Sequence, residues 1–242
     1  MQAIKTVDLV KRYKNITAVD KLNLEIVQGE IFALLGVNGA GKTTTIKMLS
    51  CLTKPTEGDA YVGGFSVTKE SDEVKKLIGV SPQETAIAPN LFVRENLELI
   101  CGICGFSKEK TEAKITELSK DFNLDSILKR KAGKLSGGWQ RRVSIAMALI
   151  GEPRILFLDE PTLGLDVIAR RELWDAINSL RGKVTIILTT HYMEEAEALS
   201  DRIGIMKDGR LLAVGTAKEL VDKLGAVNFE SAFVSIIKED KI

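Results

Sequence analysis

The sequence predicts an α/β protein with a mostly parallel central sheet, an N-terminal antiparallel β subdomain and an inserted helical subdomain. Three continuous apolar runs, at residues 31–35, 155–158 and 184–188, are typical of strands buried on both faces of a parallel sheet. Each run is followed by polar or glycine-rich residues and then by a helical pattern. This order is found in α/β sheets, whose ligands bind at the carboxyl ends of the strands.

The two other parts of the fold follow from the periodicity of the remaining chain. Residues 6–10 and 22–26 alternate apolar and polar side chains, which indicates antiparallel strands. Roughly residues 90–151 show helical patterns, among them a helix over 108–120 and another over 140–150. We interpret this stretch as a helical subdomain inserted into the α/β core.

Composition and charge exclude several classes of protein. Of the 242 residues, 45% are hydrophobic and 28% charged, as in ordinary globular proteins. Because 34 Lys and Arg face 33 Asp and Glu, the net charge of +1 supports no nucleic-acid-binding or polybasic membrane surface. The longest stretch without a charged residue has eleven residues, 31–41, whereas a bilayer span takes about 18–20. With no signal peptide at the N-terminus, we expect a soluble protein that is not exported.

Cys101 and Cys104 form a C-x-x-C pattern within a largely apolar segment, 97–106. Two thiolates at this spacing can hold a metal or exchange disulfides. A tetrahedral zinc site takes four ligands, however, and the single histidine, His191, lies far away in sequence. We therefore favour a packed apolar helix over a metal or redox site. Three cysteines without a secretory signal also indicate a reducing compartment.

Residues 36–43 match the P-loop pattern G-x-x-x-x-G-K-[ST], directly after the first apolar run and before a helical stretch at 44–51. The glycines let backbone N–H groups turn toward phosphate oxygens, and the helix N-terminus adds partial positive charge. In such a loop, Lys42 reaches the β- and γ-phosphates and the Thr43 hydroxyl can ligate Mg²⁺. The fold prediction thus narrows to a P-loop NTPase core.

Asp159 and Glu160 follow the second apolar run, where the carboxyl end of a strand is expected. There the carboxylate of Asp159 can hold Mg²⁺ through water. Glu160 comes next and can act as general base toward a water aligned on the γ-phosphate. Such a run is by itself often only a strand entering a turn, but beside a P-loop it indicates the second half of a nucleotide site.

Ser136, Gly137 and Gly138 stand at the start of the helix expected over 140–150. A serine hydroxyl and glycine N–H groups at a helix start form an anion site similar to the P-loop, without its lysine. Alone, this tripeptide is a flexible helix cap. Together with the P-loop in the same chain, the tripeptide indicates a second phosphate-binding site.

With these motifs in this order, the chain resembles the nucleotide-binding subunit of an ATP-binding cassette (ABC) transporter over residues 4–224. By this resemblance, residues 36–43 are the Walker A loop and residues 155–160 the Walker B strand. Residues 135–140 resemble the signature motif LSGGQ, with Trp139 where glutamine is usual.

The resemblance also implies roles for single residues. Gln83 matches the Q-loop, which contacts Mg²⁺ or the attacking water. Asp166 lies in the D-loop. His191 takes the place of the switch histidine, whose imidazole can bond the γ-phosphate and hold Glu160. Tyr13 occupies the position that stacks on adenine. The alternatives are a half-exposed strand tyrosine for Tyr13 and a polar surface residue for Gln83.

The candidate residues fall into three groups. The nucleotide-binding candidates are Tyr13, Gly36, Asn38, Gly39, Ala40, Gly41, Lys42, Thr43, Thr44, Ser136, Gly137, Gly138 and Asp166. The catalytic candidates are Glu160, His191, Gln83 and Lys42. The metal-ligand candidates are Thr43, Gln83 and Asp159.

The resemblance implies a cassette over residues 1–224, with the helical insert at about 84–151, and a short tail at 225–242. Within the cassette, a strand-turn-strand is expected over 202–214. The tail is weakly patterned and has no assigned function. Three of its apolar residues fit a small docking helix: Phe229, Phe233 and Ile236.

The resemblance further implies ATP and Mg²⁺ as cofactors and a head-to-tail pair of cassettes, in which each ATP lies between the Walker A loop of one and the signature of the other. The second cassette is another copy or a paralogue. A separate multi-span membrane subunit is the other expected partner, and nucleic acid is not expected. This places the chain at the cytoplasmic face of the membrane, as a peripheral subunit.

Residues 161–166 and 191–197 resemble the drug- and antibiotic-exporter branch of the family, so we expect an exporter. A binding-protein-dependent importer is the alternative. A soluble cassette ATPase in repair or cofactor assembly would share the catalytic residues, but such proteins usually carry zinc modules, a coiled coil or a second cassette, which are not visible in this sequence. A non-hydrolysing nucleotide switch is disfavoured because Lys42, Asp159 and Glu160 are present together with His191.

Overall fold

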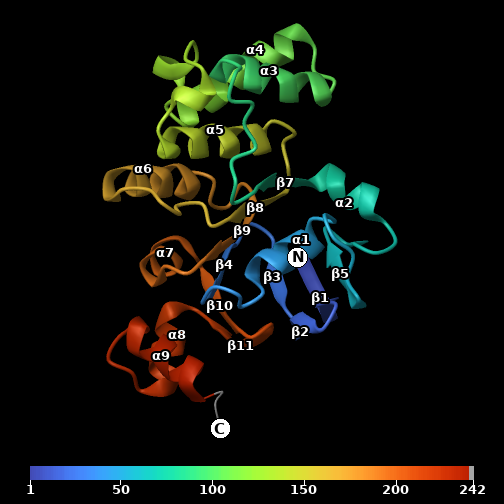
Figure 1. Cartoon of the computed structure of the whole chain (residues 1–242), viewed down its shortest axis with the longest axis vertical. Coiled ribbons are helices and arrows are strands. Elements are labelled where there is room, and N and C mark those ends of the chain that lie inside the picture. Colours follow the sequence, from blue (N-terminus) through green and yellow to red (C-terminus); the bar gives the residue numbers. More distant parts are fainter. Residues whose placement is uncertain (240–242) are drawn as a thin grey trace.

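The computed structural model describes residues 1–239 and contains two sheets with helices packed around them (Figure 1). The larger sheet has the strand order β11-β10-β4-β9-β8-β7. Its strands are β4 (Ile31–Gly36), β7 (Ile78–Ser81), β8 (Ile155–Asp159), β9 (Thr185–Thr190), β10 (Arg202–Lys207) and β11 (Arg210–Gly215). All neighbours are parallel except β10 and β11, which form the antiparallel pair expected from the sequence. The mostly parallel α/β sheet is therefore confirmed.

Both faces of this sheet are buried, which explains the continuous apolar sequences of its strands. In β4, Ile31, Ala33 and Leu35 pack into one core cluster together with helices of the inserted region. Phe32 and Leu34 point to the opposite face and join a second cluster. Since successive side chains of a strand alternate between faces, a strand covered on both sides can carry apolar residues at successive positions, as residues 31–35 do.

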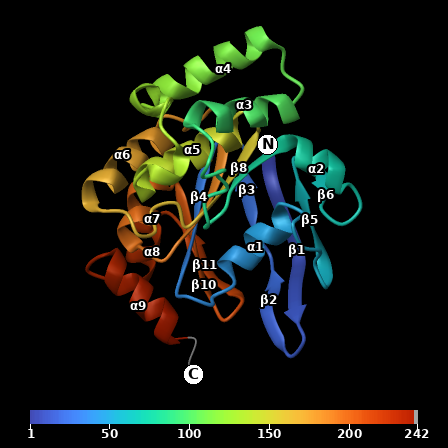
Figure 2. The ribbon, with the colours of Figure 1, turned by 45° about the horizontal axis from the view of Figure 1, so that its top comes forward.

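The second cluster lies between the six-stranded sheet and an antiparallel sheet at the N-terminus (Figure 2). This smaller sheet consists of β1 (Gln2–Tyr13), β2 (Ile16–Leu22), β3 (Glu25–Val27), β5 (Glu57–Val62) and β6 (Phe65–Ser66). Helix α1 (Lys42–Leu49) follows the P-loop and buries its apolar side in the same cluster. The antiparallel subdomain is thus confirmed, although β5 and β6 were not expected.

The strand expected over 22–26 is divided in the structure, and the expectation of one strand is wrong. Leu22 ends β2, and β3 begins only at Glu25. The hydroxyl of Thr6 donates to the carbonyl of Leu22 at 2.8 Å and accepts from the amide of Leu24 at 2.8 Å. The Thr6 side chain therefore bridges the break, beside a backbone hydrogen bond from the amide of Thr6 to the carbonyl of Leu24 at 2.9 Å.

The helical region forms one end of the molecule (Figure 1). It comprises α3 (Val93–Ile103), α4 (Lys108–Asp121) and α5 (Gly137–Leu149), with two 3-10 turns at Asp125–Ile127 and Ala132–Lys134. Ser107 caps α4 by accepting a hydrogen bond from the amide of Lys110. Cys101 is buried in α3, and Cys104 is exposed where this helix ends. Both are free thiols.

The remaining helices are α2 (Ser71–Leu77), α6 (Val167–Asn178), α7 (Met193–Leu199), α8 (Ala217–Leu224) and α9 (Phe229–Glu239). The expected docking helix forms as α9, where Phe229 is buried and Phe233 and Ile236 pack against the first core cluster. The rest of the tail, 240–242, lies outside the described residues. Within residues 1–239, no helix combines the length and the apolar composition of a membrane span. The boundaries at 84, 151 and 224 stay predictions.

Candidate functional site

A cavity of about 540 Å³ lies beside the P-loop, next to the carboxyl ends of the parallel strands. It is lined by Tyr13, Asn38, Gly39, Ala40, Gly41, Lys42, Thr43, Thr44, Gln83, Glu160 and His191, and in addition by Ala18 and Leu163. The structure therefore gathers most of the candidate residues around one space. Ala18 and Leu163 were not among the candidate residues.

The P-loop approaches neighbouring backbone so closely that two of its glycines have no substitute. A Cβ atom on Gly36 would lie 2.3 Å from the carbonyl oxygen of Met206, and one on Gly41 would lie 2.4 Å from that of Ala18. Gly41 also has a φ of 101° and is the N-cap of α1. It offers no capping side chain, so the first amides of α1 are available to an anion.

Lys42 is buried at the floor of the cavity. Its Nζ donates to the carbonyl oxygen of Gly36 at 2.7 Å and to that of Val37 at 3.3 Å. It also forms an ion pair with Oε1 of Glu160 at 3.4 Å, and the two side chains are only 6% and 8% exposed. The loop itself thus holds the ammonium group in place, and the buried charges are paired.

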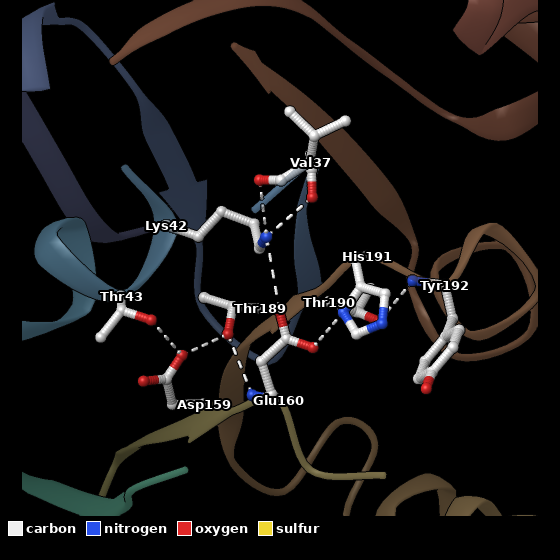
Figure 3. A network of polar contacts seen from close by, with 10 residues as sticks. Val37, Lys42, Thr43, Asp159, Glu160, Thr189, Thr190, His191 and Tyr192 are labelled. Atoms are coloured by element: carbon white, nitrogen blue, oxygen red, sulfur yellow. Dashed lines mark hydrogen bonds and ion pairs between the residues drawn. The ribbon is translucent and has the colours of Figure 1, made fainter. Parts of the chain in front are cut away.

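Asp159 ends β8 and is fixed from two sides (Figure 3). Its Oδ1 accepts from the hydroxyl of Thr43 at 3.0 Å and from that of Thr189 at 2.5 Å. A hydroxyl and a carboxylate side by side are oxygen donors of the kind that Mg²⁺ takes, with water and phosphate completing its shell. Thr43 and Asp159 therefore fit a magnesium ion.

Glu160 has a left-handed backbone with a φ of 48°, a conformation that costs about 1–2 kcal/mol for a residue with a Cβ atom. Its amide donates to the carbonyl oxygen of Thr189 at 3.2 Å and to the Thr189 hydroxyl at 3.0 Å. The Nδ1 atom of His191 lies 2.7 Å from Oε2 of Glu160, within hydrogen-bonding distance. Figure 3 shows the carboxylate held between Lys42 and His191.

Gln83 is held through its backbone by a residue that no motif identified. Arg141 of α5 donates from its two terminal nitrogens to the carbonyl oxygens of Pro82 and Gln83, each at 2.5 Å. Burial lowers the pKa of the Arg141 guanidinium. The helix that begins at the Ser-Gly-Gly motif therefore also fixes the Q-loop.

Six candidate residues lie outside the cavity lining: Gly36 and Asp159, described above, and four residues at the starts of α5 and α6. Ser136 and Gly137 are exposed at the start of α5, and the Ser136 side chain makes no capping hydrogen bond. Gly138 is buried, and a Cβ atom there would lie 3.0 Å from that of Ala169. Asp166 caps α6: its side chain accepts hydrogen bonds from the amides of the second and third residues of the helix. The nucleotide roles of these four residues stay predictions.

Comparisons of the sequence and of the fold with known proteins lead to the same family. The sequence profile of the family described as "ABC transporter" matches residues 19–163. The chain is 41% identical to "Daunorubicin/doxorubicin resistance ATP-binding protein DrrA" of Streptomyces peucetius, covering 93% of this chain and 68% of that protein. It is 40% identical to "Phospholipid-transporting ATPase ABCA3" of Homo sapiens, covering 88% of this chain.

Among solved structures, a dimeric post-hydrolysis ATP-binding cassette bound to ADP and Pi matches with a TM-score of 0.79 and 31% identity. The match covers 88% of this chain and 98% of that one. The chain spans only 12% of the length of ABCA3, so it corresponds to one part of that protein.

We expect Thr189→Val to lower the free energy of unfolding by about 1–3 kcal/mol. The substitution keeps the β-branched shape but removes the hydroxyl that bonds both Asp159 and the amide of Glu160. Urea unfolding followed by circular dichroism measures the effect. Thr116→Val, at an exposed position of α4, is the control. A loss no larger than that of the control would contradict this account of the site.

Proposed function

The chain belongs to the ABC transporter family as an ATP-binding cassette, and from this premise we propose that it hydrolyses ATP to ADP and phosphate to power a membrane transporter. The observation that carries the proposal is the contact of one carboxylate, that of Glu160, with both Lys42 and His191 beside the P-loop. Glu160, Lys42 and His191 line one cavity, which supports the roles of base, phosphate-binding cation and orienting imidazole that we propose for them.

ATP binding follows from groups that the cavity already presents. The phosphates lie against Lys42 and the amides of α1, and the adenine stacks on Tyr13, whose side chain is 44% exposed at the rim. Thr43 and Asp159 would hold Mg²⁺, which supplies positive charge to the phosphate oxygens when it is bound. Gln83 lines the same cavity.

Hydrolysis requires a base near the γ-phosphate. In the structure Lys42 neutralises Glu160; once phosphate oxygens engage the lysine, the carboxylate is released to accept a proton from water. The water oxygen then bonds to the γ-phosphorus, and the bond from that phosphorus to the bridging oxygen breaks. His191 keeps Glu160 aligned through Nδ1.

Two cassettes pair head to tail in this proposal, because Ser136 and Gly137 are exposed and lie outside the cavity of their own chain. The dimeric cassette bound to ADP and Pi supports this arrangement. The similarity to a drug-resistance ATP-binding protein favours an exporter that pairs with a membrane subunit at the cytoplasmic face. An importer is the second candidate direction.

We expect Glu160→Gln to lower ATP turnover by about 100-fold or more, because the amide cannot accept the proton of the attacking water. ATP-dependent dimers should accumulate in gel filtration, since the bound nucleotide is no longer consumed. Glu197→Gln on the exposed side of α7 is the matched control. Unchanged turnover in Glu160→Gln would refute the role of Glu160 as general base.

Tyr13→Ala should weaken ATP binding by about 1–3 kcal/mol, roughly 5- to 150-fold, through loss of stacking on the adenine. Isothermal titration with ATP on a non-hydrolysing background measures the change. Tyr61→Ala serves as the control, because Tyr61 is a strand tyrosine of similar exposure (41%) outside the cavity. If the two variants bind ATP with equal affinity, Tyr13 does not stack on the adenine and is only a half-exposed strand tyrosine.

The membrane partner is tested by gentle detergent extraction of native membranes with an affinity tag on this chain. We expect a protein with several membrane spans to co-purify in stable proportion. If the chain is instead recovered from the soluble fraction without such a protein, the proposed role in a transporter is wrong. The chain would then be a soluble cassette ATPase.

A further inference from the structure

Tyr192 lies directly after His191, in the turn that leaves β9 (Figure 3). Its amide donates a hydrogen bond to the hydroxyl of Thr190 at 2.9 Å, and its carbonyl oxygen accepts one from the amide of Ala196 at 3.2 Å. In an extended strand, successive side chains point to opposite faces. The hydrogen bond to Thr190 closes a turn at this place, and the side chains of His191 and Tyr192 lie next to each other.

The ring of Tyr192 contacts two other side chains. Its centre lies 4.1 Å from the centre of the His191 imidazole, and the two planes are tilted by 42°. Aromatic pairs favour tilted arrangements over a face-to-face sandwich. The guanidinium carbon of Arg170 lies 4.8 Å from the same ring centre, which is within the range of a cation–π contact. Arg170 stands in the first turn of α6, so the ring joins this helix to the end of β9.

The imidazole of His191 is held by few specific contacts. Among the described residues 1–239, these are the hydrogen bond between Nδ1 and Oε2 of Glu160, at 2.7 Å, and the ring of Tyr192. The side chain is 28% exposed. It lines both the cavity beside the P-loop and a second cavity of about 840 Å³, to which α7, α8 and α9 contribute. Because the outer torsion of a histidine has broad minima, a neighbouring ring restricts how the imidazole can turn.

We propose that Tyr192 is a positioning residue for ATP hydrolysis: its ring, held against Arg170, keeps the imidazole of His191 oriented toward Glu160. This inference rests on the proposed function, in which Glu160 is the general base and His191 keeps it aligned. Tyr192 is not among the residues that line the cavity beside the P-loop, so it acts through His191 and not on the nucleotide. Both contacts involve the ring, and the role therefore belongs to the ring and not to the phenolic hydroxyl.

The sequence contains a single histidine, which makes the ring contact directly measurable. In the full chain, prepared without a histidine tag and labelled with ¹³C in histidine, every imidazole signal of an NMR spectrum belongs to His191. An aromatic ring shifts the signals of nuclei close to it. We therefore expect these signals to move in Tyr192→Leu and in Arg170→Met, and to move much less in Tyr192→Phe, which keeps the ring. Tyr61→Leu, at an exposed strand position outside both cavities, should leave them in place.

ATPase kinetics test what the contact does. Tyr192→Leu should lower kcat by about fivefold, and the KM for ATP should change by less than about twofold, because alignment is altered and binding is not. Tyr192→Phe should stay within about twofold of the native kcat, and Tyr61→Leu should match the native chain. Arg170→Met should lower kcat by about threefold. Added to Tyr192→Leu, it should cause no further loss, because Arg170 acts through the ring.

Three results would overturn the inference: His191 signals that stay in place in Tyr192→Leu, a native kcat in that variant, or a Tyr192→Phe variant as impaired as Tyr192→Leu. If Tyr192→Leu fails to fold, Arg170→Met decides, and unchanged signals and kcat in that variant would contradict the inference. A native chain without ATPase activity, or one whose turnover survives Glu160→Gln, would overturn the proposed function and the role of Tyr192 with it. Native activity that is lost in Glu160→Gln but kept in Tyr192→Leu would remove only the inference.

Discussion

The Glu160 carboxylate contacts both Lys42 and His191, and these two contacts hold the candidate site together. The three residues come from segments far apart in sequence: the P-loop and the ends of β8 and β9. Parallel pairing brings them together, because Leu35 lies opposite Thr190 and Asp159 lies opposite Thr189 in register. A shift by one residue would exchange the two faces of a strand and separate these groups.

The sequence allowed prediction of those parts of the molecule that local patterns encode. The apolar runs identified three of the parallel strands, β4, β8 and β9, but not β7, and the P-loop motif and the Asp159-Glu160 pair indicated where the candidate site lies. Contacts between distant segments were not predictable in this way. The hydroxyl of Thr6 divides the expected strand at 22–26, and Arg141 fixes the Q-loop from another subdomain. A threonine or an arginine carries no local sign of such a partner. Thr189 differs, because a polar residue directly after the apolar run at 184–188 is a local sign of a polar contact at the end of that strand.

Helix α5 connects the Ser-Gly-Gly motif with the cavity. It begins beside the exposed Ser136, and through Arg141 it holds the backbone of Gln83 at the cavity. The start of α5 and the backbone of Gln83 are thus joined through one helix and the hydrogen bonds of Arg141. This mechanical link fits a cassette in which assembly with a second chain and the state of the nucleotide report on each other.

We propose that one chain supplies half of a hydrolytic site and that a second chain completes it. The most direct measurement is the ATPase rate per chain over a dilution series whose monomer and dimer populations are followed by sedimentation. We expect the rate per chain to rise with concentration and to level off when all chains are paired. A rate per chain that stays constant where sedimentation shows only monomers would contradict it.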